Sequence, residues 1–218
     1  MNDPLYAIYG ASGFGREVLP LGRELLVRAG VASDRLVFID DAPPGQLVNG
    51  HRVLTWQEFL DEPADARCVS LAIANGAIRE KLSNRLCDHG VTPWNISAAN
   101  KVELDDVAVG EGAILCAFVT LTSNIRIGRH FHANIYSYVA HDCVIGDFVT
   151  FAPGVMCNGN VVVEDHAYIG TGAILRQGKP GRPLRIGRGA VVGMGAVVTK
   201  DVAAGATVVG NPARPLVK

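Results

Sequence analysis

An apolar residue recurs at every sixth position of the second half of the chain, without a slip, from Val109 to Leu175. A helix repeats about every 3.6 residues and a strand about every 2, so neither explains this period. A period of six is typical of a parallel β-helix, in which each hexad forms one short strand and one corner, and stacked neighbours complete the core. The apolar positions are Val109, Leu115, Leu121, Ile127, Ala133, Val139, Ile145, Phe151, Cys157, Val163, Ile169 and Leu175.

Three hexads make one triangular coil of about 18 residues, so residues that far apart stack on adjacent coils at the spacing of neighbouring strands, about 4.8 Å. The period breaks after Leu175 and resumes at Ile186, Val192 and Val198. Gly and Pro in the interval predict a loop ejected from one corner over residues 177–185. We therefore predict an α/β domain with a mainly parallel sheet over residues 1–98 and a β-helix over residues 99–218.

The first half opens with a short apolar strand, residues 5–9, that runs into the glycine-rich turn 10–15 and then into a segment with helical spacing. Pro20 lies in that segment and predicts either a kink or a helix start near it. Glycines at such a turn let backbone N–H groups approach phosphates at the positive end of a helix. The turn therefore predicts a phosphate-binding site.

Two further strands, residues 36–39 and 68–74, end in polar residues. In open α/β sheets ligands gather at the carboxyl ends of strands. An NAD-binding domain is disfavoured, because the turn reads G-x-x-G-x-G and Ser12 stands where the dinucleotide fingerprint has its second glycine. A simpler alternative for the two aspartates is that they cap a strand at the surface. The candidate substrate-binding residues are Gly10, Ser12, Gly13, Asp40, Asp41 and Asn75.

Charge and cysteine content exclude several classes of function. The formal net charge is −1, and no basic stretch with interleaved aromatic residues indicates a nucleic-acid surface. Residues 176–218 nevertheless hold eight Lys or Arg against one acid, Asp201, and so favour a phosphorylated ligand. Five cysteines without a C-x-x-C pair fit reduced thiols in the cytoplasm better than disulfides or zinc, and no apolar run reaches about 18 residues.

His141 has the context of a general base. Asp142 follows it and is able to fix the tautomer of the ring and to stabilise the imidazolium. Gly159 lies one coil further on, where an uncovered backbone N–H beside the ring would donate to a developing oxyanion. The alternative for Gly159 is a corner that requires a positive φ, and both interpretations are compatible. We predict His141, Asp142 and Gly159 as the catalytic residues.

Four stretches together resemble the hexapeptide-repeat acyltransferases. These are the hexads themselves, the ending GNPARPLVK over 210–218, the sequence HDCVIG over 141–146, and GASGFGREV over 10–18 followed by FIDD over 38–41. The third resembles the family motif H-[DE]-x-x-I-G, whose His is the general base. The fourth resembles the sugar-modifying branch, which contains the bacillosamine-pathway acetyltransferases and the sialic-acid O-acetyltransferases. One departure is Asn95, which stands where the first coil often begins with His-Pro.

The resemblance implies a left-handed coil, a homotrimer, and transfer of an acetyl group from acetyl-CoA to the amine of a nucleotide-linked sugar. Such an amine is largely protonated near neutral pH, so direct attack on the thioester requires a base, and histidine suits that role. No metal is implied, and the expected setting is cytoplasmic synthesis of O-antigen or another surface polysaccharide. The positions implied for the coenzyme are Thr150, Thr171 and Met194, with Arg182, Arg185 and Arg214 of the basic tail near its phosphates.

Three alternatives stay open at this point. An O-acetyltransferase of the sialic-acid type, or an N-acetyltransferase of a UDP-4-amino-sugar, would use the same residues. A noncatalytic trimeric scaffold or sugar-nucleotide binding module would explain the hexads but would not need His141. Zinc, as in the carbonic-anhydrase branch, is disfavoured because His130 and His166 match a pair two coils apart but Thr171 occupies the position of the third ligand.

Overall fold

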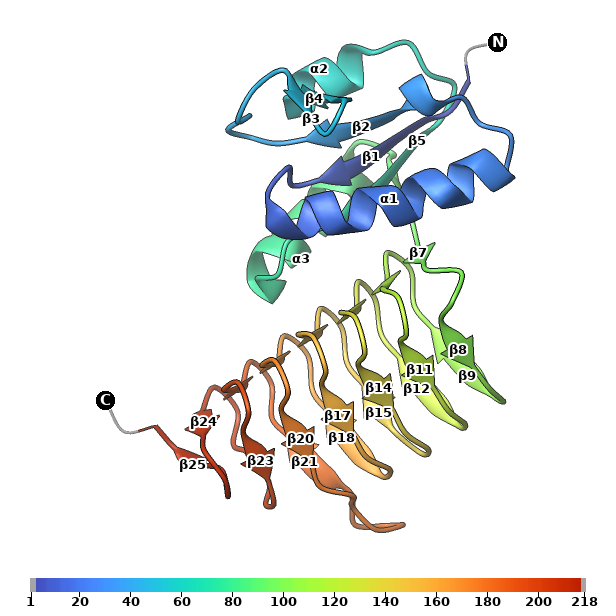
Figure 1. Ribbon diagram of the computed structural model, residues 1–218. Helices are drawn as coiled ribbons and strands as arrows, with labels where there is room; N and C mark the ends of the chain where they lie inside the picture. Colours follow the sequence, from blue (N-terminus) through green and yellow to red (C-terminus); the bar gives the residue numbers. More distant parts are fainter. Residues whose placement is uncertain (1–2, 217–218) are drawn as a thin grey trace.

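The computed structural model describes residues 3–216 and has two parts, an α/β domain above a long β-helix (Figure 1). The strand order in the α/β sheet is β3-β4-β2-β1-β5-β6, and every neighbouring pair is parallel except β3 with β4. The elements are β1 (Leu5–Tyr9), α1 (Gly13–Arg28), a 3-10 turn (Ser33–Arg35), β2 (Leu36–Ile39), β3 (Leu47–Val48), β4 (His51–Leu54), α2 (Trp56–Asp61), β5 (Arg67–Leu71), α3 (Gly76–Asp88) and β6 (Thr92–Pro93).

Both faces of this sheet are covered, because the side chains of β1 alternate between two cores. Leu5 and Tyr9 pack on the side of Phe59 in α2, whereas Ile8 packs on the side of Val18 in α1. The carboxyl ends of β1, β2 and β5 therefore meet at one edge of a layered α/β domain. The predicted mainly parallel sheet is confirmed.

Helix α1 begins at Gly13 and continues through Pro20 to Arg28. The predicted start near Pro20 is therefore wrong. Pro20 is exposed, so the carbonyl that loses its N–H partner faces water, which can replace the missing bond. The predicted third strand is shorter than expected, since β5 ends at Leu71. No helix within residues 3–216 is long and apolar enough to cross a membrane.

The second part is a left-handed parallel β-helix with three faces. The first face contains β7 (Ile96–Ser97), β10 (Ile114–Leu115), β13 (His132–Ala133), β16 (Thr150–Phe151), β19 (Tyr168–Ile169), β22 (Val191–Val192), β24 (Thr207–Val209) and β25 (Arg214–Pro215). The second contains β8 (Val102–Glu103), β11 (Thr120–Leu121), β14 (Tyr138–Val139), β17 (Met156–Cys157), β20 (Ile174–Leu175) and β23 (Val197–Val198). The third contains β9 (Val107–Val109), β12 (Ile125–Ile127), β15 (Val144–Ile145), β18 (Val161–Val163) and β21 (Leu184–Ile186).

Three edges join these faces, and each is named here by one of its residues. The His141 edge joins the second face to the third, the His130 edge joins the third to the first, and the Thr171 edge joins the first to the second. Every apolar hexad position from Leu115 to Leu175 is buried, and Val109 is partly buried against the same core. The period of six therefore marks the inward-facing row of each face.

The ejected loop is shorter than the predicted 177–185. Gly178 still occupies a coil position, since its N–H donates to the Gly159 carbonyl at 2.9 Å, and Leu184 already begins β21. The insertion is therefore residues 179–183. Lys179 and Arg182 exchange backbone hydrogen bonds of 3.1 and 2.9 Å around Pro180 and Gly181, and this sequence suits a tight turn because Gly181 has a φ of 71°.

The β-helix also begins earlier than the predicted residue 99. Strand β7 pairs with β10, and the Ile96 N–H donates to the Ala113 carbonyl at 2.9 Å. The coil ladder thus starts within the segment assigned to the first domain. Ser97 holds the inward hexad position of this coil, opposite Leu115, whereas Ile96 packs outward in the same core as Val18 of α1.

A buried arginine joins the two parts. Arg79 of α3 has no exposed surface. Its guanidinium donates to carbonyls on both sides of the seam, which is the contact between the α/β domain and the β-helix. On the α/β side the acceptors are Ile73 at 2.6 Å and Ala74 at 3.1 Å. On the β-helix side they are His130 at 3.0 Å, Phe148 at 2.6 Å and Val149 at 3.2 Å. Burial lowers the pKa of Arg79 to about 9, so the side chain stays charged at neutral pH.

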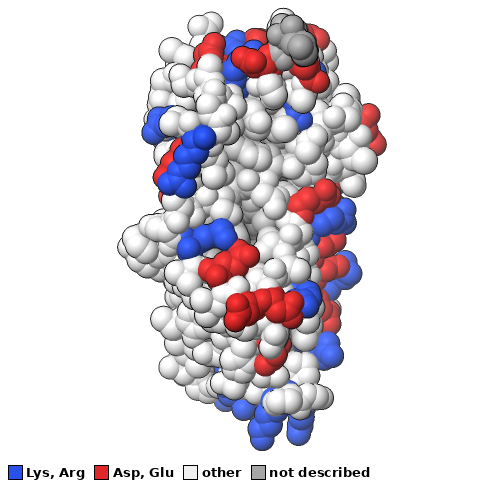
Figure 2. Space-filling view, turned by 90° about the vertical axis from the view of Figure 1, so that its right-hand side faces the viewer, with Lys and Arg blue, Asp and Glu red and all other residues white. Residues whose placement is uncertain are grey.

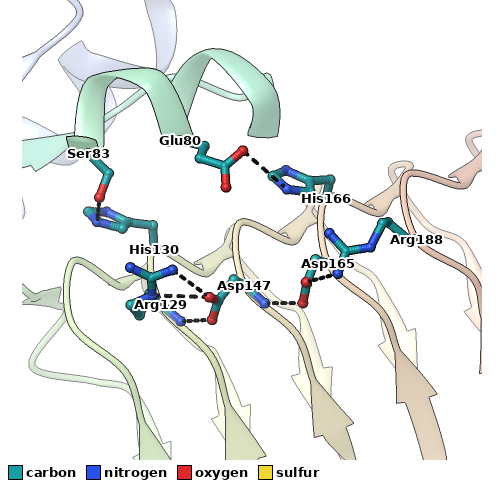
Figure 3. Close-up of polar contacts among 8 residues, drawn as sticks. All are labelled: Glu80, Ser83, Arg129, His130, Asp147, Asp165, His166 and Arg188. Atoms are coloured by element: carbon teal, nitrogen blue, oxygen red, sulfur yellow. Dashed lines mark hydrogen bonds and ion pairs between the residues drawn. The ribbon is translucent and has the colours of Figure 1, made fainter. Parts of the chain in front are cut away.

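The His130 edge makes further contacts with α3 (Figure 3). Ser83 Oγ lies 2.8 Å from His130 Nε2, and Glu80 Oε2 lies 3.5 Å from His166 Nε2. The Phe148 ring stacks between the two imidazoles at centroid distances of 5.3 and 5.4 Å. These contacts bury one face of α3 and hold the α/β domain at a fixed place over the first coils.

Candidate functional site

His141 and Asp142 form a hydrogen-bonded pair at the turn between β14 and β15. His141 Nδ1 lies 2.7 Å from Asp142 Oδ2, and both side chains are about half exposed, at 47% and 48%. The amide of Asn124, one coil earlier, donates to Asp142 Oδ1 at 3.2 Å. The pKa of Asp142 is lowered chiefly by the hydrogen bond to His141 and then by that from Asn124. An ionised carboxylate only accepts, so Nδ1 donates to it and Nε2 is left as the acceptor.

Gly159 lies directly beside the His141 ring. A Cβ atom at Gly159 would sit 2.5 Å from both Cε1 and Nε2 of His141, so no larger residue fits while the ring keeps this position. The positive φ of this corner belongs to Asn160, at 56°, and not to Gly159. The prediction that Gly159 needs a positive φ is therefore wrong, and close approach is the reason for the glycine.

The backbone N–H of Gly159 is free to act as a donor. Gly159 is buried, and its N–H makes no hydrogen bond to any other residue between 3 and 216. A buried backbone donor without a partner is rare in proteins. An acceptor brought beside the His141 ring therefore finds both a base and a preorganised donor.

Basic side chains surround a cavity further along the His141 edge. The cavity has a volume of about 440 Å³ and is lined by Arg176, Lys179, Arg182 and Lys200, with Asp201 the one acid among its lining residues. Lys and Arg also gather at the lower end of the molecule in Figure 2, where the ejected loop of Figure 1 lies. The basic tail thus gathers in line with His141, two coils beyond it.

The other basic residues of the tail lie elsewhere. Arg185 is exposed on β21 of the third face, Arg188 pairs with Asp165 at 2.5 Å, and Arg214 is on β25. Lys218 lies outside the described residues. The structure therefore brings Arg182 to the cavity but not Arg185 or Arg214, because the loop that carries Arg182 ends before β21 begins.

The residues implied for the coenzyme do not lie along the His141 edge. Thr171 and Met194 are on the Thr171 edge, and Met194 is 81% exposed there. Thr150 is on the first face, buried, and donates to the Ala74 carbonyl at 3.0 Å. Within one chain the implied coenzyme positions therefore lie apart from His141, because the twelve residues from Gly159 to Thr171 move two faces around the coil.

Part of the predicted substrate-binding set lines one cavity in the α/β domain. Ser12, Gly13 and Asp40 line a cavity of about 350 Å³ together with Arg16. Gly10 stands behind it and has a φ of 105°, which favours glycine. The Asp40 carboxylate already accepts the N–H groups of Ala11 at 2.9 Å and of residue 42 at 3.0 Å, and so it shapes the glycine turn.

Two predicted residues do not line this cavity. Asp41 accepts the Tyr9 hydroxyl at 2.9 Å and the Arg85 guanidinium at 3.4 Å. Asn75 caps α3 by accepting the Ile78 N–H at 3.0 Å. Asp41 thus serves local structure, as the surface-cap alternative anticipates, whereas Asn75 also lines a separate cavity of about 500 Å³ with Thr150.

A second cavity continues from the first along the seam between the two parts. This seam cavity has a volume of about 270 Å³, and Gly13 lines both cavities. It extends between the glycine turn and the Thr171 edge, where Pro153 and Thr171 line it. A ligand whose phosphates lie at the start of α1 would therefore extend toward that edge.

Metal ligands do not gather in the described part of the chain. Among residues 3–216 no group of three or more His, Cys, Asp or Glu side chains is placed to hold a metal ion. His130 and His166 bond to Ser83 and Glu80 instead.

Three residues that support His141 and Asp142 or line the two cavities were not predicted from the sequence. Asn124 supports Asp142, and the stacking rule that relates His141 to Gly159 also identifies it, since Asn124 lies one coil before Asp142. Arg16 lines the cavity of the α/β domain, one residue after the glycine turn. His132 lines the seam cavity, and no motif marks it.

Comparisons with known proteins agree on one family. No protein-family model matches the chain. GDP-perosamine N-acetyltransferase of Escherichia coli O157:H7 is 53% identical over 212 residues, which cover 97% of this chain and 96% of that protein. The structure of WeeI from Acinetobacter baumannii AYE superimposes with a TM-score of 0.95 and 57% identity, over 98% of this chain and 100% of that one.

A third comparison concerns a liganded structure. A histidine-to-asparagine mutant of perosamine N-acetyltransferase from Caulobacter crescentus, in complex with CoA and GDP-perosamine, superimposes with a TM-score of 0.85 and 26% identity, over 98% of this chain and 97% of that one. The chain is therefore an acyltransferase that belongs to the hexapeptide-repeat nucleotide-sugar acetyltransferases. Within that family its relatives include GDP-perosamine N-acetyltransferase, the particular enzyme that the sequence taken over its whole length also resembles.

The depressed pKa of Asp142 leads to a test of the pair. Because the folded protein favours the carboxylate, Asp142 should titrate below an ordinary aspartate, and the bond to His141 should be lost as the pH falls through that midpoint. His141→Ala should raise the midpoint more than Asn124→Ala does, since the His141 bond is the larger cause. Carboxyl carbon shifts measured by NMR against pH test this order, and a larger effect of Asn124→Ala would contradict it.

Proposed function

We propose that the protein transfers the acetyl group of acetyl-CoA to the amine of GDP-perosamine. The main support is the geometry of the His141 edge, where an oriented imidazole lies beside a free backbone donor. A relative that is 53% identical is named for this activity. The mutant of the Caulobacter crescentus relative is in complex with both CoA and GDP-perosamine. A scaffold or a plain binding module would not need the free donor beside the imidazole.

The proposed reaction is a direct attack. The sugar amine attacks the thioester carbonyl carbon while His141 Nε2 takes its proton, and Asp142 stabilises the resulting imidazolium through Nδ1. The carbonyl oxygen becomes negative in the tetrahedral intermediate, and the Gly159 N–H donates to it. The C–S bond then breaks, and the CoA thiolate takes the proton from the imidazolium. No covalent intermediate on the protein is needed.

One chain alone does not bring the substrates to His141. The seam cavity leads from the glycine turn to the Thr171 edge, whereas His141 is on the edge at the other side of the second face. We therefore propose that the sugar of one chain meets the His141 edge of a neighbouring chain. The coenzyme would lie between the two edges, with its phosphates at the basic cavity.

The second face suits such an assembly. Its outward row is free of charged residues, and Val102 and Met156 in it are 46% and 43% exposed. If three chains turn this face toward a common axis, cyclic symmetry brings the His141 edge of each against the Thr171 edge of the next. This arrangement supports the expected homotrimer. The row is Val102, Thr120, Tyr138, Met156, Ile174 and Val197.

The setting follows from the substrates. Acetyl-CoA and GDP-sugars are metabolites of the cytoplasm, and the five cysteines are free, so we place the reaction there. An N-acetylated GDP-sugar is a precursor for an O-antigen or a related surface polysaccharide. An O-acetyltransferase is the second candidate, and it is distinguished by whether an amino or a hydroxy sugar is consumed.

Replacing the base should affect the chemical step alone. His141→Asn should keep the affinities for both substrates and lower kcat by about 10²–10⁴-fold, because general-base assistance has that magnitude. Asp142→Asn should lower kcat less, since it weakens the base without deleting it. Steady-state kinetics against pH test this, and the wild-type rise in rate with pH should be absent from His141→Asn. Near-normal kcat in His141→Asn would contradict the mechanism.

The basic cavity allows a matched pair of variants. Arg182→Ala should weaken CoA binding and reduce its salt dependence, because Arg182 lines the cavity in line with His141. Arg185→Ala removes the same charge from the same tail but on the third face, so CoA affinity should change less. Calorimetric titration of CoA at two salt concentrations measures both. Equal losses of CoA affinity in the two variants would show that the basic cavity is not part of the coenzyme site.

A further inference from the structure

His132 is a fully buried side chain whose polar atoms are unsatisfied. Neither ring nitrogen has a partner within residues 3–216 that meets hydrogen-bond geometry, and the Leu71 carbonyl is the one backbone acceptor that acts on the ring. It lies in the outward row of the first face, where the α/β domain covers it. Its neighbours in that row have no such deficit, since Ile114 is apolar and Thr150 donates to the Ala74 carbonyl. Burying an imidazole in this way is unfavourable unless another group bonds to it.

The His132 ring lies at the seam cavity. Its centroid is 5.2 Å from that of Phe14 in the first turn of α1, and both residues line the cavity. Gly13, which also lines the substrate cavity of the α/β domain, lies beside them. A ligand group that enters the seam from the glycine turn therefore reaches the wall that the imidazole helps to form.

The charge state of His132 restricts what it can bind. Burial lowers its pKa well below the ordinary value, the charges of Arg79 and His130 lower it further, and the Leu71 carbonyl acts in the opposite sense. The ring is therefore neutral near pH 7, with one N–H donor and one acceptor nitrogen. A hydroxyl group, which also donates and accepts, matches this ring better than a phosphate, which favours a cation.

We propose that His132 is a specificity-determining residue that hydrogen-bonds a ring hydroxyl of the nucleotide-linked sugar, an inference that rests on the proposed function. The seam cavity then holds the hexose between the glycine turn and the Thr171 edge. Phe14, Ala74 and Ala152 supply apolar wall for the deoxygenated carbon of a dideoxy sugar. The free energy that the unsatisfied imidazole costs the free protein is recovered when the hydroxyl binds.

The test compares two buried histidines. His132→Phe keeps an aromatic ring against Phe14 but removes both nitrogens. Its Kd for GDP-perosamine should rise about 10–100-fold while its Kd for GDP stays within about twofold, because only the sugar reaches the imidazole. Its Tm without ligand should not fall. His130→Phe is the matched control, and it should lower the Tm through loss of the Ser83 contact and leave both Kd values unchanged.

Two further variants keep the test decisive. His132→Leu repeats the loss of both nitrogens with a different shape, in case the Phe variant fails to fold. His132→Gln keeps one donor and one acceptor and should recover part of the affinity for GDP-perosamine. Wild-type affinity for GDP-perosamine in the Phe or Leu variant, or equal losses for GDP and GDP-perosamine, would overturn the inference. Failure of the wild-type protein to bind GDP-perosamine would instead overturn the proposed function, and this inference with it.

Discussion

The site depends on the backbone ladder that joins each coil of the β-helix to the next. Asn160 N–H donates to the His141 carbonyl at 2.9 Å, and Gly178 N–H donates to the Gly159 carbonyl at 2.9 Å. These backbone bonds alone determine how His141, Gly159 and the base of the basic loop stack, and no side-chain contact is needed. Chemistry that requires a base and a donor at a fixed separation is thus placed on a rigid element.

The seam is the second constraint on function. Arg79 donates to carbonyls of both parts at once, and no carboxylate forms an ion pair with it among the described residues. A buried cation of this kind is tolerated because every donor direction meets an acceptor. The position of the α/β domain over the first face, and therefore the shape of the seam cavity, depends on that set of bonds. The buried imidazole of His132 destabilises the free protein, and in our proposal the same imidazole recognises the sugar.

The sequence was sufficient for features that repeat. The hexads identified the inward rows, and the stacking rule placed Gly159 beside His141, because both depend on a constant number of residues per coil. The sequence was not sufficient for residues whose role depends on local hydrogen bonds. Asp41 and Asn75 bond to their own neighbourhood, and no pattern distinguishes this from ligand binding. Thr150, Thr171 and Met194 were not placed relative to His141, because the resemblance identified these residues without saying from which chain they act.

A mixed-assembly experiment tests most directly whether the site forms between chains. His141→Asn removes the base, and Gly13→Trp fills the substrate cavity from a position where a Cβ meets no atom within 4 Å. Each variant alone should be inactive. Co-assembly in equal amounts should restore about a quarter of the wild-type activity, because a competent site needs an intact base from one chain and an intact cavity from its neighbour. Mixed assemblies as inactive as the separate variants would show that both groups must come from one chain.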